Sequence, residues 1–127
     1  MYLPYQKASY LAPINDVHHL YAVLNSPCGQ NQCLVVNVTS IKDGKYYDNA
    51  CVLNEGDHPF IRHQSYLLYR MADTMGAAKI TRYVNLKHYV TREDWGDEVF
   101  ARIVNGLAAS EDVPLRILKY ARDTGII

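Results

Sequence analysis

The sequence predicts an α+β fold that is mainly β, either a small barrel or a strongly curved antiparallel sheet with two C-terminal helices. Three observations support this. Short β-branched and aromatic segments follow one another at close spacing up to residue 90. The hydrophobic pattern then takes on a helical period. Strands and helices are also segregated along the chain instead of alternating. With 127 residues, 49% of them hydrophobic, we expect one domain, with a β part at 1–90 and a helical extension at 91–127.

Composition and flanking turns define the strands. The strongest one is Cys33–Ile41 (CLVVNVTSI), which is β-branched and bounded by polar turn residues. Asp43-Gly44 after it predicts a turn within a hairpin. Met71–Ala78 fits either a turn or a bulged strand. The other predicted strands are Lys7–Leu11, His19–Asn25, Ala50–Leu53, Ser65–Arg70 and Lys79–Val84.

Two amphipathic helices are predicted after Val90. The first spans about 92–108, with Thr91 as the N-cap and acidic residues in its first turn, where negative charge is favourable. Its apolar face carries Trp95, Val99, Phe100, Ile103, Val104 and Leu107. Ser110 or Asp112 is expected to cap the second helix, and Gly125 lies just beyond its end. Its apolar face carries Leu115, Leu118 and Ala121.

Charge is distributed unevenly along this formally neutral chain. Between His58 and Arg92 the only acidic residue is Asp73, and the segment that follows Arg92 is rich in acids. The basic residues of this stretch are Arg62, Arg70, Lys79, Arg82, Lys87 and Arg92. A basic middle suits an anionic ligand, nucleic acid included, although it is equally compatible with a solvated sheet face. No apolar run approaches the roughly 20 residues of a membrane helix, and no signal peptide is predicted, so a cytoplasmic location is expected.

Several kinds of site are disfavoured by missing motifs. Cys28 and Cys33 form one loose pair ahead of Cys51, whereas structural zinc sites usually need two close pairs. We therefore expect reduced cysteines, mostly in the core, with no metal and no cofactor. The sequence also lacks a glycine-rich phosphate loop, an H-E-x-x-H motif and a G-x-S-x-G elbow.

The segment Gly56–Ser65 concentrates the side chains best suited to chemistry. It joins two predicted strands, so it lies at a sheet end, where functional groups collect. His58 and His63 can move protons near neutral pH, and Arg62 can hold a phosphate through two hydrogen bonds. In an extended chain His63 faces the same side as Ser65, which makes Ser65 its nearest local partner. A structural alternative is a buried turn in which His58 caps a strand.

Two further candidates lie near strand ends. Thr39 and Ser40 end the strongest strand, where hydroxyls can bind a phosphate oxygen or simply satisfy a turn. His19 opens the preceding strand next to His18, and only one of two adjacent histidines can face a given site. We expect His19 to face the same end of the sheet as Thr39.

The strand pair HLYAVLNSP and CLVVNVTSI resembles the central region of the MazF/PemK/Kid-type toxins. Those carry a segment like R-P-A-L-V-L-S followed by a strand ending in V-V-P-I-T-S, and Thr39-Ser40 match the T-S position. The resemblance covers about residues 18–84. It implies an SH3-like barrel that is commonly dimeric, neutralised by an antitoxin, and that often cleaves RNA without metal through the 2′-hydroxyl.

The sequence also departs from that family. The arginine before the L-V-L strand is not matched, and His19 stands near its place. The segment Gly56–Ser65 and the second C-terminal helix lie outside the usual pattern. Arg62 and His63 are the residues that we expect to supply what the missing arginine provides.

The leading hypothesis is a toxin-like, metal-independent endoribonuclease. His63, His58 or His19 would act as acid and base, Arg62 would neutralise the phosphate and Thr39 would position it. Additional RNA contacts are expected from Ser40, Ser65, Arg70 and Arg82. One alternative is a non-catalytic module on the same barrel that binds nucleic acid or a protein through the basic strip between Arg62 and Arg92. Another is an interaction domain whose helical tail contacts a second subunit.

Overall fold

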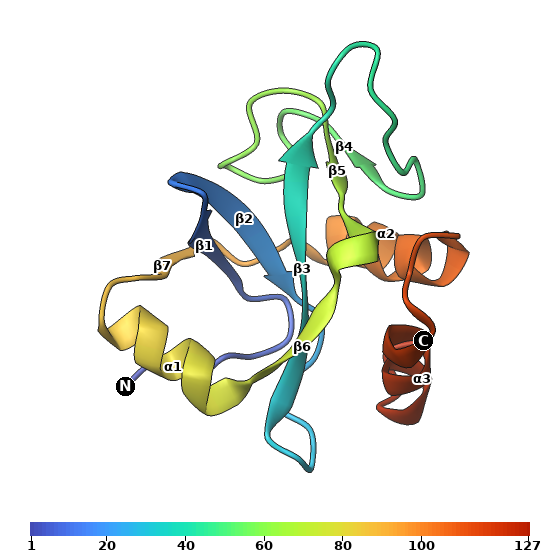
Figure 1. The fold of residues 1–127 in the computed structure, drawn as a ribbon. Helices are drawn as coiled ribbons and strands as arrows, with labels where there is room; N and C mark the ends of the chain where they lie inside the picture. Colours follow the sequence, from blue (N-terminus) through green and yellow to red (C-terminus); the bar gives the residue numbers. More distant parts are fainter.

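The computed structural model describes residues 1–127 and contains seven strands, three α-helices and one 3-10 turn (Figure 1). In chain order these are β1 (Ser9–Ile14), β2 (Val17–Val23), β3 (Gln32–Ser40), β4 (Val52–Leu53), β5 (Ser65–Leu67), the 3-10 turn η1 (Tyr69–Met71), β6 (Asp73–Gly76), α1 (Ala77–Asn85), β7 (Val90–Arg92), α2 (Asp97–Ala109) and α3 (Leu115–Asp123). None of the helices is both long enough and apolar enough to cross a bilayer.

The strands form one antiparallel sheet in the order β4-β5-β3-β2-β1-β7, with β6 paired to β3 beside this path. The sheet is strongly curved and does not close into a barrel. This confirms the predicted α+β class with a curved antiparallel sheet and two C-terminal helices, and it selects the open sheet over the barrel.

Strand β3 is the centre of the sheet and the point at which it forks (Figure 1). Its residues 35–37 pair with β2, and its residues 32–35 pair with β6 on the other edge. Its last residues, 38–40, pair with β5 instead. The edge of β3 that faces β2 is therefore left without a strand partner over residues 38–40.

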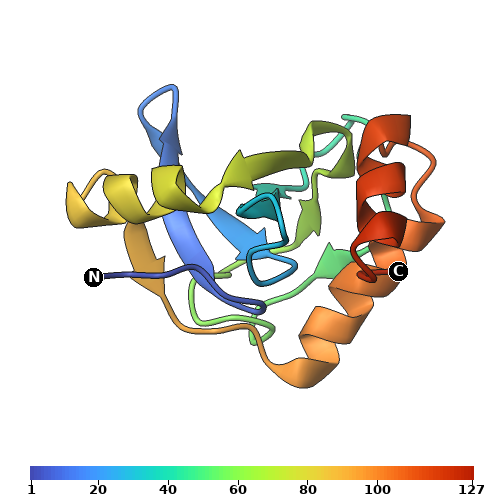
Figure 2. The same ribbon diagram turned by 90° about the horizontal axis from the view of Figure 1, so that it is seen from below.

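The alternation along β3 divides the buried side chains into two cores, since neighbouring residues of a strand point to opposite faces. Leu34, Val36 and Val38 enter a cluster of 20 buried residues, while Cys33 and Val35 enter a cluster of nine. Figure 2 shows why two cores form: α2 and α3 cover one side of the sheet and α1 covers the other.

The larger core is covered by α2, which packs tightly at Gly106 against η1 and the residues before β4. A Cβ atom at this position would lie 2.8 Å from the Cβ of Cys51 and would clash with the Tyr69 hydroxyl. That hydroxyl donates a 2.7 Å hydrogen bond to the carbonyl oxygen of Ile103. Glycine is thus required at this position by close packing, because no side chain fits between the helix and η1.

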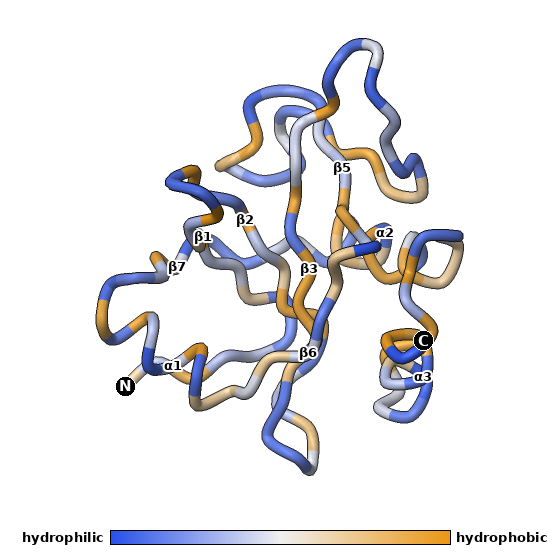
Figure 3. The backbone as a smooth tube through the Cα atoms, viewed as in Figure 1, coloured by the Kyte–Doolittle hydropathy of each residue, from blue (hydrophilic) through white to orange (hydrophobic).

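Tyrosines form much of the smaller core, in agreement with their suitability for half-buried β surface. The fully buried ring of Tyr10 is stacked between Tyr21 and Tyr89, at centroid distances of 5.2 and 4.8 Å. Figure 3 shows the complementary pattern along the backbone, with hydrophilic residues over the β3–β4 connection and the turn that precedes β3.

One predicted strand was wrong: Lys79–Val84 lies within α1. Ala77, Ile80 and Thr81 are the buried residues of this helix, a spacing of three and four residues that belongs to a helix. The β-branched residues in the segment favoured a strand locally, but their burial against the sheet determines the outcome. Within the alternative segment Met71–Ala78, Asp73–Gly76 forms the edge strand β6.

The predicted hairpin at Asp43-Gly44 was also wrong. Gly44 has a positive φ of 72° in a tight turn, but β3 and β4 do not pair with each other. Residues 41–51 form a long connection, and β4 pairs with β5. Ser65–Arg70 is shorter as a strand than predicted, because β5 ends at Leu67 and η1 follows.

The helix starts lie later than predicted. Thr91 belongs to β7, which pairs with β1, and α2 begins only after Gly96. Ser110 and Asp112 lie in the connection between α2 and α3, where the Asp112 N–H donates to the Ser110 hydroxyl, and α3 begins after Pro114. The predicted apolar face of α2 was confirmed for Phe100, Ile103 and Leu107, although Trp95 lies before the helix. The predicted face of α3 was wrong at Leu115, which is 83% exposed, and the buried residues of this helix are Ile117 and Ala121. The predicted caps were also wrong, since the pairing of β7 with β1 and the connection before α3 occupy those residues.

Candidate functional site

A pocket of about 720 Å³ opens where β3 separates from β2. Its walls are the β1–β2 hairpin, the end of β3, the segment that precedes β5, and Arg92 from β7. The lining contains six basic or imidazole side chains and no carboxylate: His18, His19, Lys42, Arg62, His63 and Arg92. Such a concentration of one sign of charge in a concave site favours an anionic ligand.

His63 is paired with Ser40 in this pocket. The His63 Nε2 atom lies 2.6 Å from the Ser40 hydroxyl oxygen, and both side chains line the pocket. Ser65, the partner expected from sequence, instead donates its hydroxyl to the carbonyl oxygen of His63 at 3.0 Å and is itself buried. Ser40 and Ser65 are cross-strand neighbours, so β3–β5 pairing brings the three residues together.

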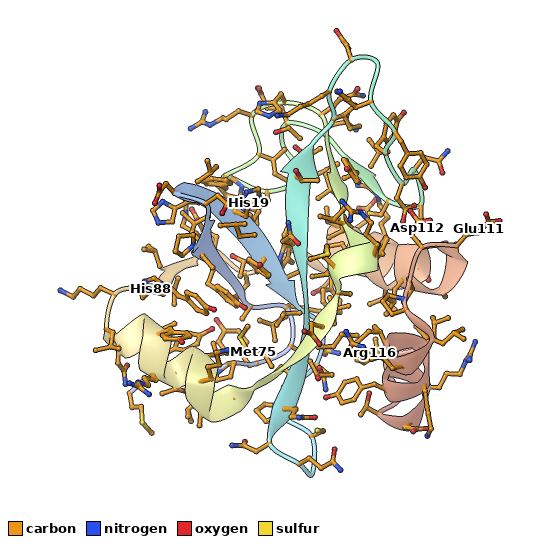
Figure 4. The ribbon with its side chains drawn as sticks, in the orientation of Figure 1. His19, Met75, His88, Glu111, Asp112 and Arg116 are labelled. Carbon is orange, nitrogen blue, oxygen red and sulfur yellow. The ribbon has the colours of Figure 1, made fainter.

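His19 and Thr39 approach the pocket from facing strands. The pairing of β2 with β3 ends at Tyr21–Asn37, so His19 and Thr39 lie two residues beyond it, where the two strands separate. The Nδ1 atom of His19 lies 3.4 Å from the carbonyl oxygen of Val38, which is a long contact. Figure 4 shows His19 on β2 beside β3. His19 and Thr39 both line the pocket. His18 lines it as well, so the expectation that only one of these two adjacent histidines can face the site was wrong.

Arg92 is a site residue that sequence analysis placed only in a broad basic strip. Pairing of β7 with β1 brings it to the pocket, 30 residues after Arg62 in the chain. Its Nε atom lies 3.2 Å from the Glu93 carboxylate, and its guanidinium lies 5.2 Å from the centre of the Phe60 ring. It is half-buried and held in place, whereas Arg62 is exposed. Sequence analysis likewise missed Lys42 in the pocket.

His58 lies outside the pocket, with only 2% of its surface exposed. The Phe60 N–H donates to Nδ1 at 3.1 Å, which leaves the proton on Nε2, and Nε2 donates to the Glu93 carbonyl oxygen at 2.8 Å. The Ser9 hydroxyl lies 3.2 Å from the same nitrogen. These bonds match the structural alternative for His58, a buried turn, and leave neither ring nitrogen free for a substrate.

Burial lowers the pKa of His58, although the hydrogen bond to Glu93 acts in the opposite direction. The unfolded chain binds a proton near the ordinary pKa of about 6.5, and the folded chain binds it less readily. Protonation therefore favours unfolding, and this contribution to stability is lost as the pH falls below about 6.5, by at most about 1.4 kcal/mol per pH unit.

The variant His58→Gln tests this role. At pH 8 it is expected to be less stable than the wild type by about 1–3 kcal/mol, since one buried hydrogen bond is lost. The difference is expected to shrink as the pH is lowered to 5, because only the wild type carries the titrating group. Urea unfolding of both proteins at each pH measures it. A difference that stays constant from pH 8 to pH 5 contradicts the assignment.

Arg70 and Arg82 are not brought to the pocket. Arg70 lies in η1, next to α2, and Arg82 lies on α1 on the other side of β3 (Figure 1). Together with Arg92 they are distributed over separate surfaces. The basic stretch of the sequence is thus not one continuous basic surface, which removes a main support of the basic-strip hypothesis.

The cysteines and histidines do not form a metal-binding cluster. No group of three or more histidine, cysteine or acidic side chains lies close enough to hold a metal ion. All three cysteines are free thiols, with Cys33 and Cys51 buried. Burial raises the pKa of the Cys33 thiol to about 11, as expected for a core residue.

Comparison with known proteins shows a similarity in fold. No protein-family model matches the sequence, and no curated protein matches it significantly. Among solved structures, a chain of the crystal structure of MazE-MazF (Form-II) from Deinococcus radiodurans is similar, with a TM-score of 0.56 and 12% sequence identity. The alignment covers 86% of this chain and 95% of that one. The chain therefore has a MazF-like fold over most of its length.

Proposed function

We propose that this chain is the toxin of a toxin–antitoxin pair and acts as a metal-independent endoribonuclease. The observation that carries the proposal is the pocket at the β3 fork, which gathers three imidazoles and three cations without a carboxylate in its lining. A phosphodiester needs this combination, since its cleavage requires proton transfer at two oxygens and stabilisation of negative charge on phosphorus.

His63 is the proposed general base. Its exposed imidazole can reach a substrate, and its Nε2 atom already makes a 2.6 Å hydrogen bond to a hydroxyl group, that of Ser40. The RNA 2′-hydroxyl would take the place of the Ser40 hydroxyl at Nε2. His63 accepts the 2′ proton, the 2′ oxygen forms a bond to phosphorus, and the bond from phosphorus to the 5′ oxygen breaks.

His19 is the proposed general acid, since it lies across the pocket on β2. It donates a proton to the departing 5′ oxygen, which leaves a 2′,3′-cyclic phosphate on one product and a 5′-hydroxyl on the other. Arg92 and Arg62 neutralise the charge that develops on the non-bridging oxygens. Lys42 and Thr39 border the same space and are proposed to position the phosphate.

The antitoxin part of the proposal rests on the fold and on the neighbour's name, which describes a MazE-MazF complex. An acidic segment of a partner protein would fit the same cationic pocket and exclude RNA from it. We also propose a homodimer, as the sequence resemblance implies.

A second candidate is a module that binds a polyanion without cleaving it. Two observations favour it: no carboxylate makes a hydrogen bond to His63 to orient its ring, and Arg62 is exposed. A binding pocket needs only positive charge, whereas a catalytic one needs two imidazoles at defined positions. The two candidates share the pocket and differ in whether RNA is cut.

The deciding experiment incubates purified protein with single-stranded RNA in EDTA and analyses the product ends. We expect cleavage that yields 2′,3′-cyclic phosphate and 5′-hydroxyl ends. Intact RNA that nevertheless binds in a salt-dependent manner would favour the polyanion-binding module. Cleavage that EDTA abolishes would contradict the metal-independent mechanism.

A further inference from the structure

We propose that Tyr66 and Tyr47 form a stacking platform for an unpaired nucleobase of the RNA, next to the phosphate-binding pocket. The two rings lie at a centroid distance of 5.7 Å with 50° between their planes. Neither ring lines the pocket itself. This inference rests on the proposed function, and it adds a site that selects single-stranded RNA.

The register of the sheet places Tyr66 beside the pocket. Tyr66 has two direct cross-strand partners: Thr39 on β3, which lines the pocket, and Val52 on β4. Side chains of direct partners share a face, about 5 Å apart. The neighbours of Tyr66 along β5, Ser65 and Leu67, are buried on the opposite face. A half-buried row therefore runs from the edge of the pocket across two strands.

Tyr47 is held over this row by the connection between β3 and β4. The preceding residue, Tyr46, donates its hydroxyl to the Asp112 carboxylate at 2.7 Å. The following residue, Asp48, is buried and accepts hydrogen bonds from the Ala50 N–H and from the Ser110 hydroxyl. Figure 4 shows Asp112 at the end of α2, below this connection. Anchors on both sides fix the backbone of Tyr47, while the residue remains 38% exposed.

A nucleobase fits this platform better than other occupants. Bases stack on aromatic rings irrespective of their sequence, and the negative charge of the connected phosphate is satisfied by the cations of the pocket one strand away. A base paired within a duplex cannot reach a ring at the surface of a sheet without leaving its stack. The platform thus selects RNA that is already unpaired at this nucleotide.

The test uses 2′-O-methyl RNA heptamers, which cannot be cleaved through the 2′ oxygen, and fluorescence anisotropy at fixed salt. Tyr47→Ala is expected to weaken binding about 10-fold, and Tyr66→Leu by a similar factor. Each nucleotide of the heptamer is then replaced in turn by an abasic one. At one position this replacement is expected to weaken RNA binding by the wild type by about 10-fold. At that position Tyr47→Ala is expected to show no further loss, because the base and the ring form one contact.

Tyr5→Ala is the matched control. Tyr5 belongs to another tilted tyrosine pair, with Tyr2 at 6.5 Å and 45°, but its hydroxyl faces Asp94 and not the pocket. It is expected to bind like the wild type. The platform would be overturned if the Tyr47 and Tyr66 variants fold and bind RNA as well as Tyr5→Ala does. It would also be overturned if the abasic nucleotide weakens RNA binding by Tyr47→Ala as much as it weakens binding by the wild type. RNA cleavage that continues alongside such a result leaves the proposed function standing, whereas a wild type that neither binds nor cuts RNA overturns both.

Discussion

Replacement of His63 by alanine is expected to lower the rate of RNA cleavage by about 10²- to 10⁴-fold, the usual contribution of a general base. The imidazole of His63 is exposed, and the hydrogen bond from its Nε2 atom goes to the Ser40 hydroxyl. The loss should therefore fall on kcat, while the affinity for RNA changes little, since Arg62, Arg92 and Lys42 are proposed to hold the phosphate. Single-turnover cleavage and equilibrium binding measure the two quantities separately.

His88→Ala is the matched control for this variant. His88 is also exposed, but it follows α1 and packs against Tyr83, away from His19 in Figure 4. It is expected to cleave at the wild-type rate. Added imidazole should partly restore cleavage by His63→Ala and should leave His88→Ala unchanged. A His63→Ala protein that cuts as fast as His88→Ala would remove His63 from the mechanism and leave His19 or His18 as the base.

The parts of the fold that sequence predicts well are those with strong local patterns. Cys33–Ile41 was predicted within one residue of β3 at each end, because a continuous β-branched run is buried on both faces. The apolar face of α2 was equally evident from its period, whereas the period assigned to α3 included the exposed Leu115 and missed the buried Ile117. By contrast, the segment KITRYV contains β-branched residues at a spacing that also fits a helix. It becomes part of α1 because its buried residues then pack against the sheet.

The site was predicted in part, for a similar reason. Thr39 and Ser40 were singled out as the end of the strongest strand, and Arg62 and His63 for their chemistry in a segment that joins two strands. All four line one pocket, and their roles on RNA stay predictions. Arg92 arrives from β7, and nothing in its local sequence distinguishes it from Arg82 on α1. Only the pairing of β7 with β1 separates the two arginines, and strand pairing over 80 residues leaves no local mark in the sequence.

His58 illustrates the opposite error. It shares its segment with His63, and both were candidates because histidine can transfer protons near neutral pH. Only the imidazole of His63 is exposed to a substrate. The Phe60 N–H and the Glu93 carbonyl oxygen occupy both ring nitrogens of His58. The acceptor at Glu93 comes from 35 residues further along the chain, so the sequence pattern around His58 contains no sign of it.

Loss of the Arg92 charge is expected to have the second large effect on the reaction. Arg92→Met replaces the guanidinium, which lies 5.2 Å from the centre of the Phe60 ring, by an uncharged and shorter unbranched side chain, so the cation is removed from the pocket. Preorganised charge at a developing oxyanion contributes about 10²- to 10³-fold to kcat, and we expect a loss of that size. Binding to RNA should weaken as well, and the slope of log affinity against log salt should fall by about one phosphate contact.

Two comparisons separate charge from packing in this experiment. Arg82→Met removes an exposed arginine from α1, outside the pocket, and is expected to leave kcat and the salt slope unchanged. Glu93→Gln removes the carboxylate 3.2 Å from the Arg92 Nε atom and leaves the guanidinium over Phe60. Because an unpaired guanidinium attracts phosphate more strongly, Glu93→Gln should bind RNA more tightly than the wild type, opposite in sign to Arg92→Met. If Arg92→Met behaves like Arg82→Met, or if Glu93→Gln weakens binding, Arg92 serves only to hold Phe60 in place and the phosphate is held by Arg62 and Lys42.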